Sequence, residues 1–151
     1  MAVITVGTNS YATEAELATY AADRGITIAE ADTTILLIKA MDYIETRRFV
    51  GSKTEVTQTL EWPREVCSGT LYCEIDNLVV PTDIKSAQMI AALIIDAGDE
   101  VQPTVERAVK REKVDVLEVE YMDTASALKQ HTKLNDILRP YILNTLKAVR
   151  A

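Results

Sequence analysis

The stretch that decides the fold is PTDIKSAQMIAALIIDAG, residues 81–98. Thr82 is a typical helix N-cap, Asp83 suits the positive end of a helix dipole, and Gly98 stands where a helix commonly ends. The residues between them are apolar nearly all round, which predicts a helix that other elements cover on more than one side. We expect this helix to form the centre of the core.

Two helices are predicted before it. Thr13 followed three residues later by Glu16 is a capping box, and it predicts a short amphipathic helix. A longer helix then starts at Thr27 or at Asp32 and runs to about Arg47, with an apolar stripe wide enough to be covered on more than one side.

Between residues 49 and 80 the helical period disappears, which predicts a long irregular loop with short extended pieces. This loop holds Trp62, the only tryptophan of the chain, directly before Pro63. One hypothesis makes Trp62 a stacking platform for single-stranded nucleic acid, but that mode needs several aromatic rings in a basic groove. The favoured interpretation is a large ring that anchors the loop to the helical body.

Two patterns follow the central helix. Charged, extended sequence from 107 to 113 and the period-two run LEVEY at 117–121 predict a β-hairpin at about 106–121. Apolar residues then recur at helical spacing from Leu134 to Val149, and Pro140, on the polar side, should kink this predicted helix or free the carbonyl of Asp136. The sequence therefore predicts a mainly α protein: a small helical bundle with a long irregular loop, a β-hairpin and a C-terminal helix.

The composition is that of a soluble globular protein. The chain has 151 residues, 48% hydrophobic and 26% charged, which suits one domain. No apolar run is long enough to span a membrane, and we expect no membrane partner. The net charge of −7, with scattered basic residues, argues against tight binding of nucleic acid.

The sequence carries no constellation typical of an enzyme or a metal site. It has no glycine-rich phosphate loop, no nucleophile elbow and no paired-histidine zinc motif. Cys67 and Cys73 stand far from His131 and make a poor zinc site, so two free thiols are the favoured interpretation. We expect a protein that is not an enzyme and has no cofactor and no metal.

Five segments together resemble a known protein family. The most specific are QTLEWPRE at 58–65 and VPTDIKSAQMIAALIIDAGD at 80–99, and the others are NSYATEAELATYAADRG, LIKAMDYIETRRFVGSKT and VKREKVDVLEVEYMD. Taken in their order along the chain, they resemble the phage family of small head–tail connector or adaptor proteins, often labelled as putative DnaT-like single-stranded DNA binding proteins. The resemblance covers almost the whole chain and is weakest at 67–78 and after Asp123.

The resemblance implies a structural protein of the phage neck. Such adaptors form a ring, usually dodecameric, beneath the portal protein, where they extend the DNA channel and dock the next neck or tail-completion protein. Genomic DNA would pass through the lumen without specific binding, and negative charge there would keep it from adhering. The protein would be found in the virion neck, and in the host cytoplasm during assembly. The alternative function is single-stranded DNA binding, which the family label supports and the charge opposes.

Under the connector hypothesis each part of the chain has a role. Residues 1–123 form the adaptor body with its hairpin, and residues 124–151 form a linker and a C-terminal docking helix. The stripe expected to dock on the portal, and to be buried only on assembly, consists of Leu138, Tyr141, Ile142 and Leu146. The hairpin residues expected to contact a neighbouring subunit are Arg107, Lys110, Arg111, Lys113, Glu118 and Glu120. The alternatives are that the stripe packs on its own subunit and that the hairpin is a solvent-facing flap.

Overall fold

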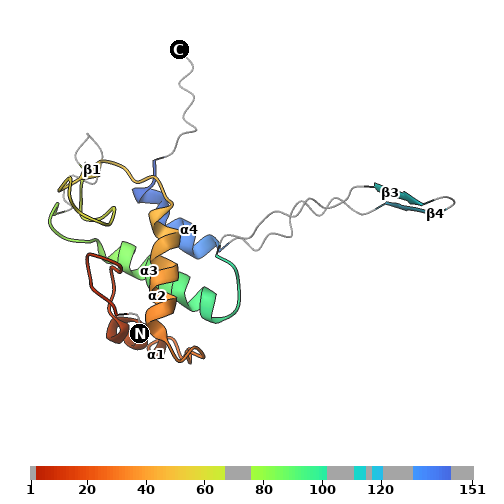
Figure 1. The fold of residues 1–151 in the computed structure, drawn as a ribbon, viewed down its shortest axis with the longest axis horizontal. Coiled ribbons are helices and arrows are strands. Elements are labelled where there is room, and N and C mark those ends of the chain that lie inside the picture. The colour runs from red at the N-terminus through yellow and green to blue at the C-terminus, as the bar shows by residue number, and fades with distance from the viewer. Residues whose placement is uncertain (1–2, 67–75, 102–110, 115–116, 121–130, 144–151) are drawn as a thin grey trace, which may run out of the picture.

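The structure is a computed structural model that describes residues 3–66, 76–101, 111–114, 117–120 and 131–143 (Figure 1). Its helices are α1 (Glu14–Ala22), α2 (Thr33–Glu45), α3 (Thr82–Asp96) and α4 (Thr132–Leu138), followed by a 3-10 turn, η1 (Arg139–Tyr141). Its strands are β1 (Ser52–Lys53), β2 (Arg64–Glu65), β3 (Arg111–Val114) and β4 (Leu117–Glu120). The predicted class, mainly α with a β-hairpin, is confirmed.

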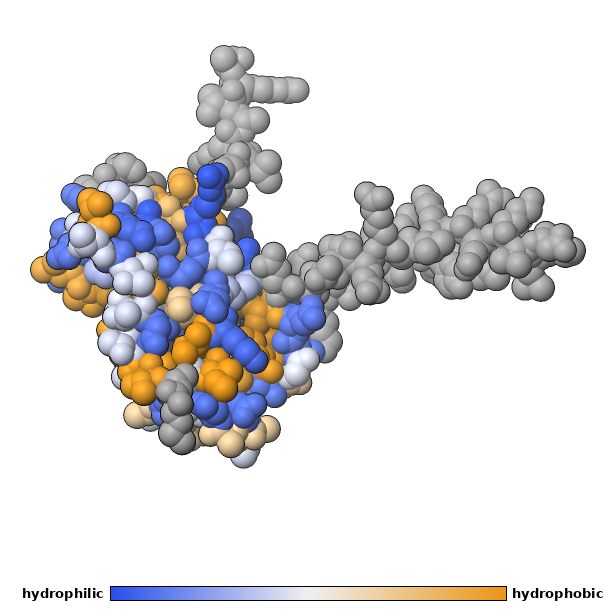
Figure 2. All heavy atoms as spheres, in the orientation of Figure 1, coloured by the Kyte–Doolittle hydropathy of each residue, from blue (hydrophilic) through white to orange (hydrophobic). Residues whose placement is uncertain are grey.

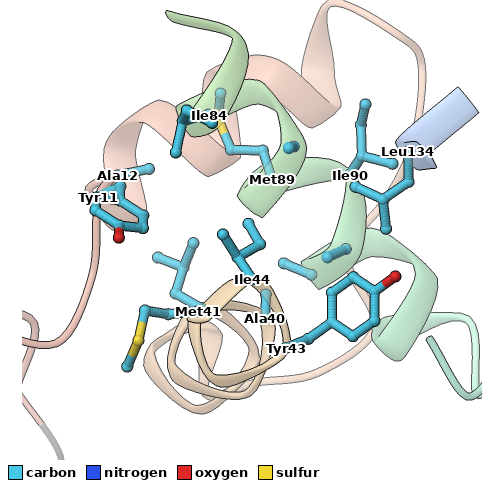
Figure 3. Packing of buried hydrophobic residues seen from close by; sticks show 14 of the residues in the cluster. Tyr11, Ala12, Ala40, Met41, Tyr43, Ile44, Ile84, Met89, Ile90 and Leu134 are labelled. Carbon is cyan, nitrogen blue, oxygen red and sulfur yellow. The ribbon is translucent and has the colours of Figure 1, made fainter. Parts of the chain in front are cut away.

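Helix α3 is the centre of the fold, as its sequence predicts. It packs against α1, α2 and α4, and Figure 3 shows its Ile84, Met89 and Ile90 within the same apolar cluster as Ala40 and Ile44 of α2. The helix begins at Thr82 with Pro81 as its N-cap, so Thr82 is the first helical residue and not the cap.

The predicted capping box of α1 is confirmed. The Thr13 hydroxyl accepts a hydrogen bond from the Glu16 backbone N–H at 3.2 Å, and the Glu16 carboxylate accepts one from the Thr13 N–H at 2.7 Å. The backbone N–H of Thr13 and the Lys85 ammonium favour the ionised carboxylate, so the pKa of Glu16 lies below its usual value. The Lys85 ammonium, 3.0 Å from the Glu16 carboxylate, also links α3 to α1.

Helix α2 starts after Asp32, and the earlier start at Thr27 is wrong. The reason is a tertiary contact, because the carboxylate of Asp96 at the end of α3 accepts hydrogen bonds from the backbone N–H groups of Ala29 and Glu30, the latter at 2.7 Å. These donors are therefore held by another element instead of beginning a helix.

The C-terminal helix is shorter than predicted. It ends at Leu138, Pro140 lies in η1, and Ile142 is extended. Ile142 forms an antiparallel bridge with Phe49, with the Val50 N–H donating to the Tyr141 carbonyl at 2.9 Å. Pro140 interrupts the helix, as predicted, but the predicted continuation of the helix beyond it is wrong through residue 142, because these backbone groups pair with the loop. Residues 144–151 lie outside the described residues.

The predicted hairpin is confirmed as the antiparallel pair β3–β4. In Figure 1 the two strands stand apart from the helices, and among the described elements β3 and β4 pack only on each other. In the part of the chain that the structure describes, no helix is long and apolar enough to cross a membrane.

Candidate interaction surfaces

Trp62 lies inside the body, where it anchors the loop that carries it. Its side chain is 1% exposed, and its ring meets the rings of Phe49 and Tyr141 edge to face, with centroids 5.7 and 5.6 Å away. The start of the loop at Phe49, its middle at Trp62 and the 3-10 turn η1 at Tyr141 therefore share one aromatic cluster. Tyr141 extends the link to α3, because its hydroxyl donates to the Asp83 carboxylate at 2.7 Å.

A buried polar network fixes the backbone beside Trp62. The Glu45 carboxylate of α2 accepts hydrogen bonds from the Tyr11 hydroxyl and from the Glu61 backbone N–H, the latter at 2.9 Å. The Tyr11 oxygen accepts a hydrogen bond from the backbone N–H of Trp62 at 3.2 Å. Burial raises the pKa of the Tyr11 hydroxyl and also that of the Glu45 carboxyl, because desolvation penalises each charged form.

The guanidinium of Arg64 links two parts of the loop. It is buried and donates to the backbone carbonyls of Val50, at 3.0 Å, and Gly51, and it pairs with the Glu61 carboxylate. Gly51 has a φ of +82°, and a Cβ atom there would collide with the carbonyl of Glu65. The hydrogen bonds and the ion pair of Arg64, together with the left-handed backbone of Gly51, thus hold residues 49–51 against residues 61–65 without a helix or a long strand.

This burial leaves the described aromatic residues poorly placed to stack on nucleic-acid bases. Besides Trp62, the buried aromatic side chains are Tyr11, Tyr43, Phe49 and Tyr141. Tyr20 is partly exposed, but the guanidinium of Arg24 lies 3.4 Å from its ring centroid. A row of free rings, which sequence-tolerant binding of single strands uses, is therefore not present among the described residues.

The register of the hairpin separates its residues into two faces. Arg111 lies opposite Glu120, and Lys113 lies opposite Glu118, so one face alternates opposite charges across the two strands. On the other face Glu112 lies opposite Val119, and Val114 lies opposite Leu117. The period-two run LEVEY predicts the apolar positions Leu117 and Val119 of β4, and the register adds Val114 of β3 to the same face. Arg107 and Lys110 lie outside the described residues.

A hollow of about 290 Å³ lies between α1, the second half of α3 and the start of α4, and we call it the α3 groove. Its apolar lining is Tyr20, Ile26, Ile90, Leu93, Ile94 and Ala97. Arg24, Asp99, His131 and Lys133 complete the lining, so the groove carries more basic than acidic groups. Figure 2 shows that apolar residues reach the surface of the helical body between hydrophilic ones. Sequence reasoning missed this groove, because its residues come from three elements far apart in the chain.

The residues expected to dock on the portal lie mainly inside the chain's own fold. Leu138 and Tyr141 are buried in the chain's own core, and Ile142 is partly buried at its bridge to Phe49. The expectation that these residues are covered only on assembly is therefore wrong for Leu138 and Tyr141, because α3 and the Trp62 loop already cover them. Leu146 lies outside the described residues.

Among the described residues, no three His, Cys, Asp or Glu side chains gather in a way that could hold a metal ion. Cys67 and Cys73 lie outside this part of the chain. His131 is one of the residues that line the α3 groove, and its Nε2 lies 3.3 Å from the Glu100 carbonyl.

Comparison with known proteins gives one match. A family model described as "Putative DnaT-like ssDNA binding protein" matches residues 2–151. No curated protein and no solved structure matches the chain.

Proposed function

The chain belongs to the family described as putative DnaT-like ssDNA binding proteins, and we propose that this protein is a structural component of a phage neck. In this proposal it is a head–tail adaptor: copies of the chain form a ring, dodecameric by resemblance, under the portal protein. The ring extends the DNA channel and docks the next neck or tail-completion protein. It acts in the virion, after assembly in the host cytoplasm, and it catalyses no reaction.

The hairpin is the observation that carries this proposal. A two-stranded hairpin alone is marginally stable in water and needs a further element to cover an apolar face. No described element of the chain packs on β3 and β4. A contact with another subunit would provide that cover, which is what a ring of adaptors requires.

The charge of the molecule also supports a channel wall over a DNA-binding surface. The chain carries 23 acidic and 16 basic residues, and phosphate contacts depend on lysine and arginine. A wall with negative charge would let DNA pass without holding it.

The test is the mass of the purified chain by light scattering, alone and mixed with the portal protein of the phage that encodes it. The proposal expects either a ring-sized species or a chain that joins the portal in a fixed stoichiometry. A monomer that ignores the portal would overturn it.

Single-stranded DNA binding is the second candidate, because the family description names it. Titration with an oligonucleotide at several salt concentrations tests it, since real phosphate contacts make affinity fall steeply with salt. The fluorescence of Trp62, the only tryptophan, gives a second readout. Because its ring is buried, the adaptor proposal expects no quenching by DNA, whereas salt-sensitive binding with quenching would favour this candidate.

A further inference from the structure

We propose that the apolar face of the β3–β4 hairpin docks in the α3 groove of a second copy of this chain. The inference rests on the proposed ring and names the two surfaces that join its subunits. The hairpin of one subunit would fill the groove of the next, whose own hairpin would fill a third.

By register, one face of the hairpin holds three apolar residues and a single charged one. Val114, Leu117 and Val119 share one face by register, and Glu112 is the fourth residue of that face. The opposite face has two directly opposed pairs of unlike charge, so its charges are balanced within the ribbon. Glu112 lies opposite Val119 and has no charged residue across from it. The partner of this face should therefore be apolar with a basic rim.

The α3 groove has that character. Most of its lining residues are apolar, and the exposed side chains of Arg24 and Lys133 also line it, against one carboxylate, Asp99. None of the ion pairs between described residues involves Arg24 or Lys133. A basic side chain at the rim can therefore meet Glu112 when the apolar face covers the floor.

A second hollow, of about 420 Å³, provides a contrast. It lies on another side of the end of α3 and includes Asp42, Asp99 and Glu100 but only one basic residue, Lys39. Like charge would oppose Glu112 there. Charge complementarity thus selects the α3 groove from the two hollows.

The positions of the two surfaces in the chain favour a second copy over the chain's own groove. The groove includes Asp99 and His131, which flank the segment that contains the hairpin in sequence. The strands themselves stand away from the helices in Figure 1. Contact between a projecting element and a different site on the next molecule is heterologous, and repetition of such a contact closes into a ring when the rotation permits.

Disulfide trapping between differently tagged full-length chains tests the proposal. Both chains carry Cys67→Ser and Cys73→Ser; one adds Leu117→Cys, and the other adds Ala97→Cys in the groove, at an exposed position. The matched control places the second cysteine at Thr46, which is exposed in the other hollow. We expect the Leu117→Cys chain to form a disulfide with the Ala97→Cys chain and not with the Thr46→Cys chain. This should hold for the protein alone or for its complex with the portal.

Other outcomes separate this inference from the proposed function. A cross-link that forms only when both cysteines are in one chain would mean that the hairpin closes on its own groove, and it would overturn the inference. A portal complex or ring without any cross-link would also overturn it, while the adaptor proposal stands. Absence of self-association and of portal binding would overturn both.

A charge exchange tests the ionic contact separately. Arg24→Glu and Glu112→Arg should each weaken self-association on the order of tenfold, and the two changes in one chain should restore it. Arg48→Glu, at an exposed position outside the groove, is the control and should leave association unchanged. Double-variant chains that associate no better than the single variants would contradict a contact between these two residues.

Discussion

Gln88 connects three parts of the body through one buried side chain. Its Oε1 accepts hydrogen bonds from the backbone N–H groups of Tyr11 and Ala12, at 2.9 and 3.0 Å, and its Nε2 donates to the Ser10 hydroxyl and the Leu37 carbonyl. All of its hydrogen-bonding capacity in the core is therefore used. Such a residue fixes how the N-terminal segment and α2 meet α3.

We expect Gln88→Met to lower the free energy of unfolding by about 2 to 4 kcal/mol, because methionine fills a similar volume but removes all four hydrogen bonds and leaves the buried Tyr11 N–H unpaired. Urea unfolding followed by circular dichroism measures this. Asn135→Met replaces an exposed amide on α4 and should change stability by less than about 0.5 kcal/mol. Equal losses in the two variants would contradict the assigned role.

Glu45 makes the stability of the loop depend on pH. Its pKa in the folded protein is raised above its ordinary value of 4.5, chiefly by burial, so the folded state holds the proton more tightly than the unfolded state. The stabilisation from protonated Glu45 is present below about pH 4.5 and is lost as the pH rises through the folded pKa.

In Glu45→Gln this titration is absent. The difference in unfolding free energy, wild type minus variant, should therefore be most positive below about pH 4.5 and should decrease as the pH rises toward about pH 7. Urea unfolding of both proteins at matched pH values gives this difference. Parallel pH profiles would show that Glu45 does not titrate differently in the folded and unfolded states.

At the scale of elements, local signals in the sequence predicted structure well. The capping box of α1 and the nearly uniform apolar pattern of α3 depend on residues within one or two helical turns, so they could be interpreted without knowledge of the fold. The period-two run of β4 likewise placed the hairpin.

The errors arose where another element competes for the backbone. Asp96 holds the N–H groups that an earlier start of α2 would use, and Phe49 pairs with Ile142, where the C-terminal helix was predicted to continue. The α3 groove could not be predicted either, because its lining residues, from Tyr20 to Lys133, lie far apart in the sequence. Pairings over such separations leave no periodic pattern in the sequence.

Helix α4 belongs to the core of the isolated chain, and this can be tested without any partner. Leu138→Ala removes a fully buried side chain and should lower the free energy of unfolding by about 2 to 5 kcal/mol. Leu143, which is 50% exposed, is the control, and its replacement by alanine should cost less than about 1 kcal/mol. Thermal or urea unfolding without the portal measures both. A Leu138→Ala chain as stable as wild type would return this residue to the docking hypothesis.

At the scale of the whole molecule, the net charge and the proposed contact act in opposite directions. Each chain carries a net charge of −7, so subunits repel one another as they assemble. The proposed contact between hairpin and groove is mostly apolar, and salt screens charges without weakening apolar burial. The balance between these effects determines how assembly responds to salt.

We therefore expect self-association to strengthen when sodium chloride is raised from about 50 mM to about 500 mM, because this range shortens the screening length well below the size of the subunit. Sedimentation velocity over a concentration series measures the change, and a non-ionic osmolyte at equal osmolality controls for effects other than screening. Binding to single-stranded DNA would respond with the opposite sign, since salt removes the gain from counterion release. Association that weakens steeply with salt would mean that ion pairs hold the subunits together, and the apolar face of the hairpin would then not be the main contact.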